Sequence, residues 1–216
     1  MAQEQTPGSA IYTPRLLPLY DFTVLTVSNA LLWRCPTPEL LAHYDRHVSD
    51  RHMDIGVGSG FFLDRCHFPK DSPAVALVDL NPGALQFAAQ RISRYRPTTH
   101  QANVLEPFSV DVAPFASVGL NYLLHCLPGP MAHKGAVFKH VKPMLAPGGV
   151  VFGATILSGG VELGWLARRV MGAYNARGIF GNQQDDLPAL EAELAKHFSR
   201  HTVELRGCVA LFAAWA

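Results

Sequence analysis

An acid followed by three closely spaced glycines stands in His52-Met53-Asp54-Ile55-Gly56-Val57-Gly58-Ser59-Gly60-Phe61. Residues 53–55 have the composition of the end of a buried strand, and Phe61 begins an apolar helix. Glycines at alternate positions between them allow a sharp turn, and they let the backbone approach a ligand with no Cβ in the way. The stretch therefore predicts a strand-turn-helix unit that binds a nucleoside cofactor.

The spacing of the glycines distinguishes between cofactors. A dinucleotide fingerprint requires a third glycine at the sixth position, and this position holds Phe61 when counted from Gly56 and Leu63 when counted from Gly58. The pattern Asp54-x-Gly56-x-Gly58-x-Gly60 instead resembles motif I of the class I S-adenosylmethionine-dependent methyltransferases. The resemblance implies S-adenosylmethionine as the cofactor, with the acid fixing the loop and the cofactor's amino group.

Further motifs follow in the order that this family shows. Ala74-Val-Ala-Leu-Val-Asp79 is an apolar run ending in an acid about twenty residues beyond the glycines, where a ribose-binding carboxylate lies in such folds. Asn103 follows the next expected strand, and its amide oxygen can accept a bond from the adenine amino group. Ser117 to Pro128 resembles motif IV, without its usual early acid. The resemblance implies cofactor contacts at Asp79, Leu80, Asn103, Val104 and Asn121.

The remaining patterns predict the architecture. We expect an α/β, Rossmann-like class I methyltransferase fold: a mostly parallel seven-stranded sheet with an antiparallel C-terminal strand and N-terminal lid helices. Gly207 joins two strand-like runs too closely for anything but a hairpin. We expect one domain over 1–216, with 1–50 as the helical lid and substrate segment and 51–216 as the cofactor-binding core. Helices are predicted over 37–47, 61–67, 82–94, 131–144, 162–177 and 187–198, and strands over 74–79, 98–100, 150–156, 202–206 and 208–214.

The block before motif I, with Tyr20-Asp21, Ser28-Asn29 and Trp33-Arg34, resembles the lid of quinone-biosynthesis-like and secondary-metabolite methyltransferases. It is similar to that of microbial indole C3-methyltransferases that form pyrroloindolines, which implies C-methylation of an indole. Tyr12, Phe22 and Trp33 are candidates to line an aromatic substrate. His125 is the candidate base, because an ordinary histidine pKa near 6.5 suits proton transfer near neutral pH. Tyr20 is the second candidate catalytic residue.

Composition excludes several classes of function. The net charge of +1 provides no broad phosphate-binding face, so we expect no nucleic-acid partner. We expect a cytoplasmic protein, monomer or homodimer, that is not associated with a membrane. His43 and His47 have the spacing of a zinc pair, but Tyr44 replaces the acid of that motif, so no metal is predicted.

Three alternatives to C-methylation remain open at this stage. The first is methyl transfer to the oxygen or nitrogen of a small molecule, since enzymes that methylate carbon, oxygen or nitrogen share the same cofactor site. The second is a nicotinamide-dependent Rossmann oxidoreductase. The third is a non-catalytic cofactor-binding partner subunit.

Overall fold

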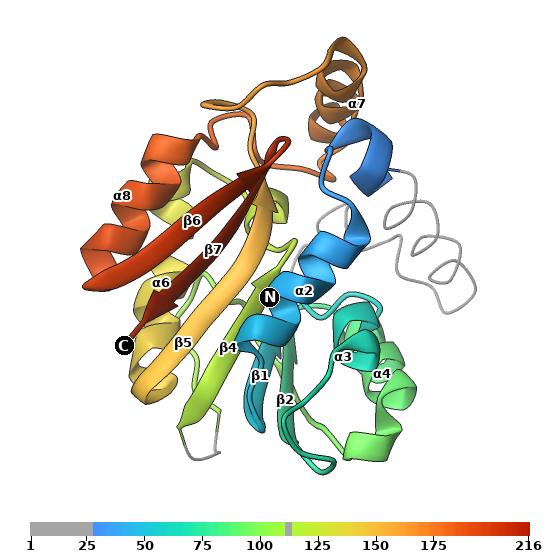
Figure 1. Ribbon diagram of the computed structural model, residues 1–216, viewed down its shortest axis with the longest axis vertical. Helices are drawn as coiled ribbons and strands as arrows, with labels where there is room; N and C mark the ends of the chain where they lie inside the picture. The colour runs from blue at the N-terminus through green and yellow to red at the C-terminus, as the bar shows by residue number, and fades with distance from the viewer. Residues whose placement is uncertain (1–27, 111–113) are drawn as a thin grey trace, which may run out of the picture.

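The computed structural model describes residues 28–110 and 114–216, and within them a single sheet of seven strands runs through the molecule in the order β3-β2-β1-β4-β5-β7-β6 (Figure 1). β1 to β5 are parallel, β7 is antiparallel to β5, and β6 is antiparallel to β7. The predicted methyltransferase-type sheet and its final hairpin are confirmed. The strands are β1 Arg51–Ile55, β2 Ala74–Asp79, β3 Thr98–Gln101, β4 Phe115–Asn121, β5 Leu145–Ile156, β6 Arg200–Arg206 and β7 Val209–Trp215.

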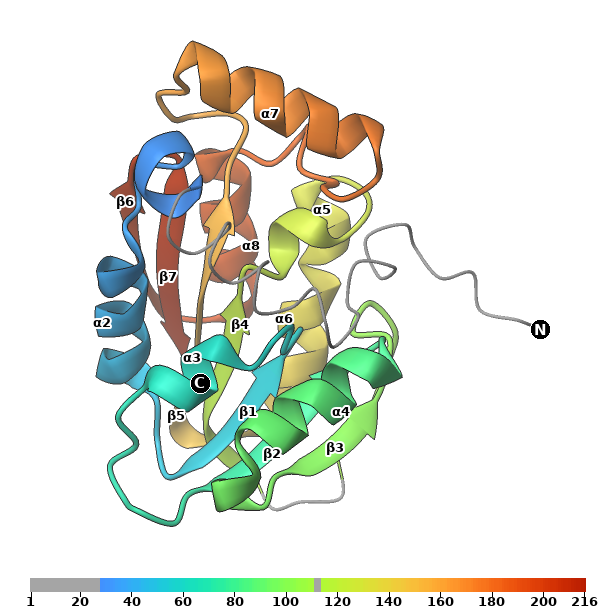
Figure 2. The same cartoon turned by 90° about the vertical axis from the view of Figure 1, so that its right-hand side faces the viewer.

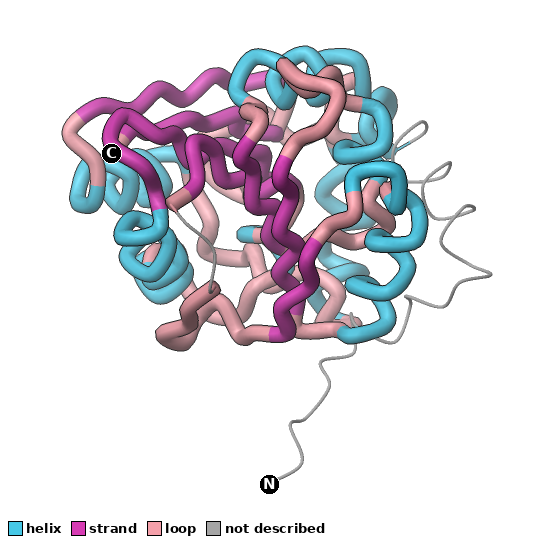
Figure 3. Tube along the Cα trace, turned by 90° about the horizontal axis from the view of Figure 1, so that it is seen from below, coloured by secondary structure: helices cyan, strands magenta, loops and turns pink. Residues whose placement is uncertain are grey.

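Helices cover both faces of the sheet (Figures 2 and 3). They are α2 Thr37–His47, α3 Phe61–Arg65, α4 Pro82–Arg91, α5 Met131–Lys134, α6 Ala136–Val141, α7 Trp165–Ala176 and α8 Leu187–His197, with short 3-10 helices η3 Ser93–Tyr95, η4 Leu124–Cys126 and η5 Lys142–Met144. Strand alternation sends Met53 and Ile55 into the apolar core under α5, α6 and α8. His52 and Asp54 therefore point to the opposite face, which α2, α3 and α4 cover.

The order of the strands creates a ligand site at one edge of the sheet. The chain goes from β1 outward to β2 and β3, and then returns to β4 on the other side of β1. Where the strand order reverses in this way, the connections after the two strands separate, and ligands bind beyond the carboxyl ends. The loops after β1 and β4 therefore border the position where a ligand would bind.

Some predicted elements differ from those in the structure. The helix predicted over 131–144 is divided at Gly135, where a side chain would overlap the Glu193 carboxylate of α8. β5 begins at Leu145, not at 150, and its pairing with β4 shifts register there. α7 begins at Trp165, three residues later than predicted. No helix in the described residues is long and apolar enough to cross a membrane.

Helix α2 does not lie over the carboxyl ends of the strands, as the lid prediction for this segment required. Its buried residues Leu40, His43 and Tyr44 follow helical spacing and pack on β5 and β7. The helix therefore covers one face of the sheet. Residues 28–34 do reach the carboxyl edge, where Trp33 O accepts a hydrogen bond from Cys208 N at 3.0 Å.

Candidate functional site

The loop after β1 requires glycine at its turning points. Gly56, Gly58 and Gly60 all have left-handed backbone angles, with φ of 72°, 50° and 71°. A Cβ at Gly56 would lie 2.7 Å from Leu123 Cδ1, and one at Gly60 would lie 3.1 Å from Ala88 Cβ. The loop can therefore follow this path only with glycine at these positions.

Asp79 ends β2 beside this glycine loop. Its Oδ1 accepts a hydrogen bond from Asn81 N at 2.8 Å. Burial raises the pKa of Asp79 to about 6, although the backbone N–H groups of Asn81, Gly58 and Val57 favour the charged form. The carboxylate thus faces the loop in a poorly solvated position, and hydroxyl donors from a ligand would stabilise its charge.

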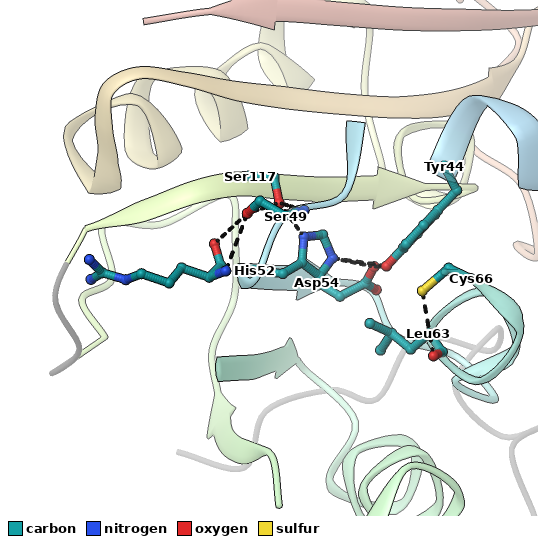
Figure 4. A network of polar contacts seen from close by, with 8 residues as sticks. Tyr44, Ser49, His52, Asp54, Leu63, Cys66 and Ser117 are labelled. Atoms are coloured by element: carbon teal, nitrogen blue, oxygen red, sulfur yellow. Dashed lines mark hydrogen bonds and ion pairs between the residues drawn. The ribbon is translucent and has the colours of Figure 1, made fainter. Parts of the chain in front are cut away.

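Asp54, the second acid of the site, joins a network of polar contacts through its Oδ2. Its Oδ2 accepts a hydrogen bond from the Tyr44 hydroxyl at 2.7 Å and lies 3.4 Å from His52 Nε2 (Figure 4). The negative charge of Asp54 also contributes to the raised pKa of Asp79. Two carboxylates therefore flank the glycine loop, a charge pattern that suits a cation and hydrogen-bond donors.

Asn121 ends β4 as a buried amide with unused hydrogen-bonding groups. Neither its Nδ2 nor its Oδ1 has a partner in the part of the chain that the structure describes. A buried amide without partners costs roughly 1–3 kcal/mol, so such groups call for a ligand or water. Leu123, two residues later, packs on Gly56, which places Asn121 next to the glycine loop.

The predicted adenine contacts form a local turn after β3. Asn103 Oδ1 accepts a hydrogen bond from Leu105 N at 3.1 Å, and its Nδ2 donates to Glu106 Oε1 at 2.9 Å. Val104 is buried, whereas Leu80 beside Asp79 is 38 % exposed. An exposed leucine at this position offers an apolar surface for a flat ring. The roles of these residues stay predictions.

His125 lies on η4, just beyond β4, between two aromatic rings. Its ring is edge-on to Tyr122 and Phe180, with centroid distances of 5.3 and 4.7 Å. Burial, reinforced by the Lys134 charge, lowers the pKa of His125 to about 3. His125 was the candidate base because of the ordinary histidine pKa. In the fold its pKa is lower, because a buried imidazole resists protonation.

The predicted aromatic lining is only partly described. Trp33 is buried, and its ring centroid lies 6.0 Å from that of Phe180, so Phe180 connects Trp33 with His125. Tyr12, Tyr20 and Phe22 lie outside the described residues, and their roles stay predictions. The sequence patterns did not predict roles for Tyr44, His52, Tyr122 and Phe180. For His52 a signal existed, since strand alternation places it on the same face as Asp54.

The histidine pair on α2 belongs to the core. His43 Nε2 is 3.1 Å from Phe212 O, and the His43 and His47 rings are 4.8 Å apart. Burial lowers the pKa of His43 to about 4. Over the described ranges, no group of three or more His, Cys, Asp or Glu side chains could hold a metal ion.

Together these features fit S-adenosylmethionine. The glycine loop leaves room for backbone contact, the unpartnered Asn121 amide can bond a polar group, and the two acids suit a ribose diol and an amino group. A dinucleotide fit would need the third glycine where Phe61 begins α3.

Comparisons with known proteins agree with this fit. A methyltransferase domain model matches residues 53–151. The demethylluteothin O-methyltransferase of Streptomyces thioluteus is 43% identical over 213 residues, 99% of this chain and 93% of that protein. The physcion biosynthesis cluster O-methyltransferase of Aspergillus chevalieri is 39% identical over 96% of this chain and 94% of that protein.

Solved structures share the fold at low sequence identity. The DhpI-SAH complex has a TM-score of 0.68 at 15% identity and covers 97% of this chain and 95% of that chain. The N-methyltransferase NodS from Bradyrhizobium japonicum WM9, in complex with S-adenosyl-l-homocysteine, has a TM-score of 0.56 at 18% identity over 81% of this chain and 82% of that chain. The chain therefore belongs to the class I S-adenosylmethionine-dependent methyltransferases that act on small molecules, with S-adenosylmethionine as its cofactor.

Proposed function

We propose that this enzyme methylates a hydroxyl oxygen of a small natural-product-type molecule. The observation that carries the proposal is the likeness to the Streptomyces and Aspergillus enzymes, both O-methyltransferases by name, over more than nine-tenths of each chain. This likeness favours oxygen over the indole carbon that the block before motif I implied.

The environment of His125 supports the same choice of acceptor. Nδ1 of His125 accepts the Ile156 N–H at 3.4 Å, which leaves the proton of the neutral ring on Nε2. With a pKa of about 3, this ring is a poor base near neutral pH but a good hydrogen-bond donor. Indole C3-methylation requires a base for the ring N–H, whereas an acidic hydroxyl, such as an enol or an electron-poor phenol, ionises without one.

The residues of the site divide the work in this proposal. S-adenosylmethionine supplies an electrophilic methyl group on a sulfonium. Asp79 binds the ribose hydroxyls, Asp54 the amino group, and Asn121 a polar group of the methionyl part. His125 Nε2–H orients the acceptor oxygen, while Trp33 and Phe180 contact its ring and exclude water.

The test uses purified full-length protein with S-adenosylmethionine and matched acceptors. An electron-poor hydroxyarene, the same ring without the hydroxyl, and an indole would each be incubated, and S-adenosylhomocysteine release would be followed by mass spectrometry. NMR would then locate the new methyl group. We expect an O-methyl product from the hydroxyarene alone, and a slower reaction in Asp79→Ala when S-adenosylmethionine is limiting.

Other products would contradict the proposal. A methyl group on indole C3 or on nitrogen, with none on oxygen, would overturn it. Binding of S-adenosylhomocysteine without turnover of any hydroxylated acceptor would favour a non-catalytic subunit instead.

A further inference from the structure

A chain of buried polar side chains leads away from Asp54 along the face of the sheet under α2 (Figure 4). From Asp54 Oδ2, the Tyr44 hydroxyl lies at 2.7 Å, and His52 Nε2 lies 2.8 Å from that hydroxyl. His52 Nδ1 lies 2.8 Å from Ser117 Oγ, which accepts the Ser49 N–H at 2.9 Å. These five residues, called the relay below, connect the cofactor loop with the start of β1 and β4.

The hydrogen bonds of the relay can run in one direction when His52 is neutral. The ionised Asp54 carboxylate only accepts, so the single Tyr44 hydroxyl proton points to it. The Tyr44 oxygen must then accept from His52 Nε2–H, and the other ring nitrogen accepts from the Ser117 hydroxyl. The protons of Ser117, His52 and Tyr44 therefore all point toward Asp54, and the carboxylate is their terminal acceptor.

Packing holds the Tyr44 hydroxyl in place. The Tyr44 ring is fully buried, lies stacked on Phe62 of α3 at 5.7 Å, and meets Phe152 of β5 edge-on at 5.1 Å. Gly119 on the neighbouring strand β4 leaves room for the Asp54 carboxylate, because a Cβ at Gly119 would lie only 2.7 Å from Asp54 Oδ2. A shift of the Tyr44 hydroxyl or of the Asp54 carboxylate would therefore disturb the packing against α3, β4 and β5.

We propose that Tyr44 is a positioning residue for the cofactor: its hydroxyl fixes Oδ2 of Asp54 and so presents Oδ1 to the ammonium group of S-adenosylmethionine. The proposal rests on Asp54 contacting the cofactor, and it is independent of the methyl acceptor. A charge-assisted hydrogen bond between buried groups holds a carboxylate far better than packing alone. The consequence is that α2, which lies outside the glycine loop, contributes to cofactor affinity.

A double-mutant cycle in the full-length protein tests this proposal. Calorimetric titration with S-adenosylhomocysteine would be run on the wild type, Tyr44→Phe, Asp54→Ala and the double variant, with folding checked by thermal unfolding. We expect Tyr44→Phe to weaken binding about tenfold in the wild-type background and by less than about twofold in the Asp54→Ala background. In the single variant Tyr44→Phe, the KM for S-adenosylmethionine should rise while kcat stays unchanged.

Two comparisons separate positioning from general loss of packing. Tyr95→Phe removes a hydroxyl from a partly buried tyrosine of the same apolar cluster and should leave affinity unchanged. In an Asp79→Ala background, Tyr44→Phe should keep its full effect, since the relay does not include Asp79. If Asp54→Ala does not fold, Asp54→Asn replaces it, and the loss caused by Tyr44→Phe should shrink because the acceptor is no longer charged.

Several outcomes would overturn the proposal. Wild-type affinity in Tyr44→Phe would show that the hydroxyl does not matter. An equal loss with and without the Asp54 carboxylate would show that Tyr44 acts through packing. Wild-type affinity in Asp54→Ala would remove the premise, whatever acceptor the enzyme uses.

Discussion

Lys134 Nζ lies 2.6 Å from Asp185 Oδ2, and neither side chain has any exposed surface. The same ammonium donates to Gly181 O at 3.0 Å, and Gly181 N donates to His125 O at 2.8 Å. The ion pair therefore ties the segment after α7, which carries Phe180, to the short helix that carries His125. A buried pair of this kind is costly to desolvate, so its value lies in holding one arrangement of these two segments.

Removing one member of this pair should destabilise the fold. Lys134→Met leaves the Asp185 carboxylate buried without its cation, and we expect the free energy of unfolding to fall by about 3 kcal/mol. Urea denaturation measures this value. A double variant, Lys134→Met with Asp185→Leu, leaves no unpaired charge and should lose less. If the single variant were as stable as the wild type, the pair would not bind the two segments together.

Loss of the Asp79 carboxylate should weaken cofactor binding more than a change at the aromatic wall. Asp79→Ala removes the proposed charged hydrogen bonds to two ribose hydroxyls, and we expect affinity for S-adenosylhomocysteine to fall at least about tenfold. Trp33→Phe, with folding verified, is the comparison and should change this affinity little. Calorimetric titration measures both, and unchanged affinity in Asp79→Ala would disprove the ribose assignment.

Cofactor binding should also depend on pH through Asp79. Its pKa is raised to about 6, so the free protein holds a proton there at acid pH, while bound ribose hydroxyls favour the carboxylate. Binding should therefore release a proton, and affinity should fall as the pH drops below about 6. Titrations in two buffers with different heats of ionisation reveal the proton. Asp79→Asn should bind the cofactor less tightly, and its affinity should no longer depend on pH. A wild-type affinity that is flat between about pH 5 and 7.5 would contradict this role of Asp79.

His125 should affect turnover and not cofactor affinity. His125→Asn removes the proposed Nε2–H donor, and we expect kcat to fall about tenfold to a hundredfold with unchanged binding of S-adenosylhomocysteine. His133→Asn, at an exposed position on α5, is the matched control. Because the pKa of His125 is about 3, the wild-type kcat should show no histidine titration between about pH 5 and 7. Such a titration, lost in His125→Asn, would restore this residue as a general base.

Two buried histidines should make the fold sensitive to acid. The pKa of His43 falls to about 4 and that of His125 to about 3, while in the unfolded chain both lie near 6.5. The unfolded state therefore gains protons first, and stability falls as the pH drops below 6.5, by about 1.4 kcal/mol per pH unit for each histidine. Asp79, with a raised pKa, opposes this trend between about 6 and 4. Urea denaturation at several pH values should show a smaller slope for His43→Gln, and an unchanged slope would contradict this account.

Features that depend on local backbone chemistry could be predicted from the residues alone. Glycines at 56, 58 and 60 predicted a sharp turn, and all three have a left-handed φ that favours glycine. Gly207, with φ of 57°, turns the predicted final hairpin. The apolar run ending at Asp79 predicted a buried parallel strand, because burial on both faces leaves no alternation. In each case the residue type restricts the backbone within a few positions.

The side chains that surround those features follow from the packing of distant elements. Tyr44 reaches Asp54 because α2 packs on the sheet, and no spacing in the sequence encodes that contact. Burial beside Lys134 reversed the expectation for His125, since a pKa follows from solvation and neighbouring charge, not from residue type. Phe180 reaches His125 across 55 positions of sequence, through a segment tied down by the Lys134–Asp185 pair. Contacts between distant elements depend on how whole faces pack together, and local propensity does not carry that information.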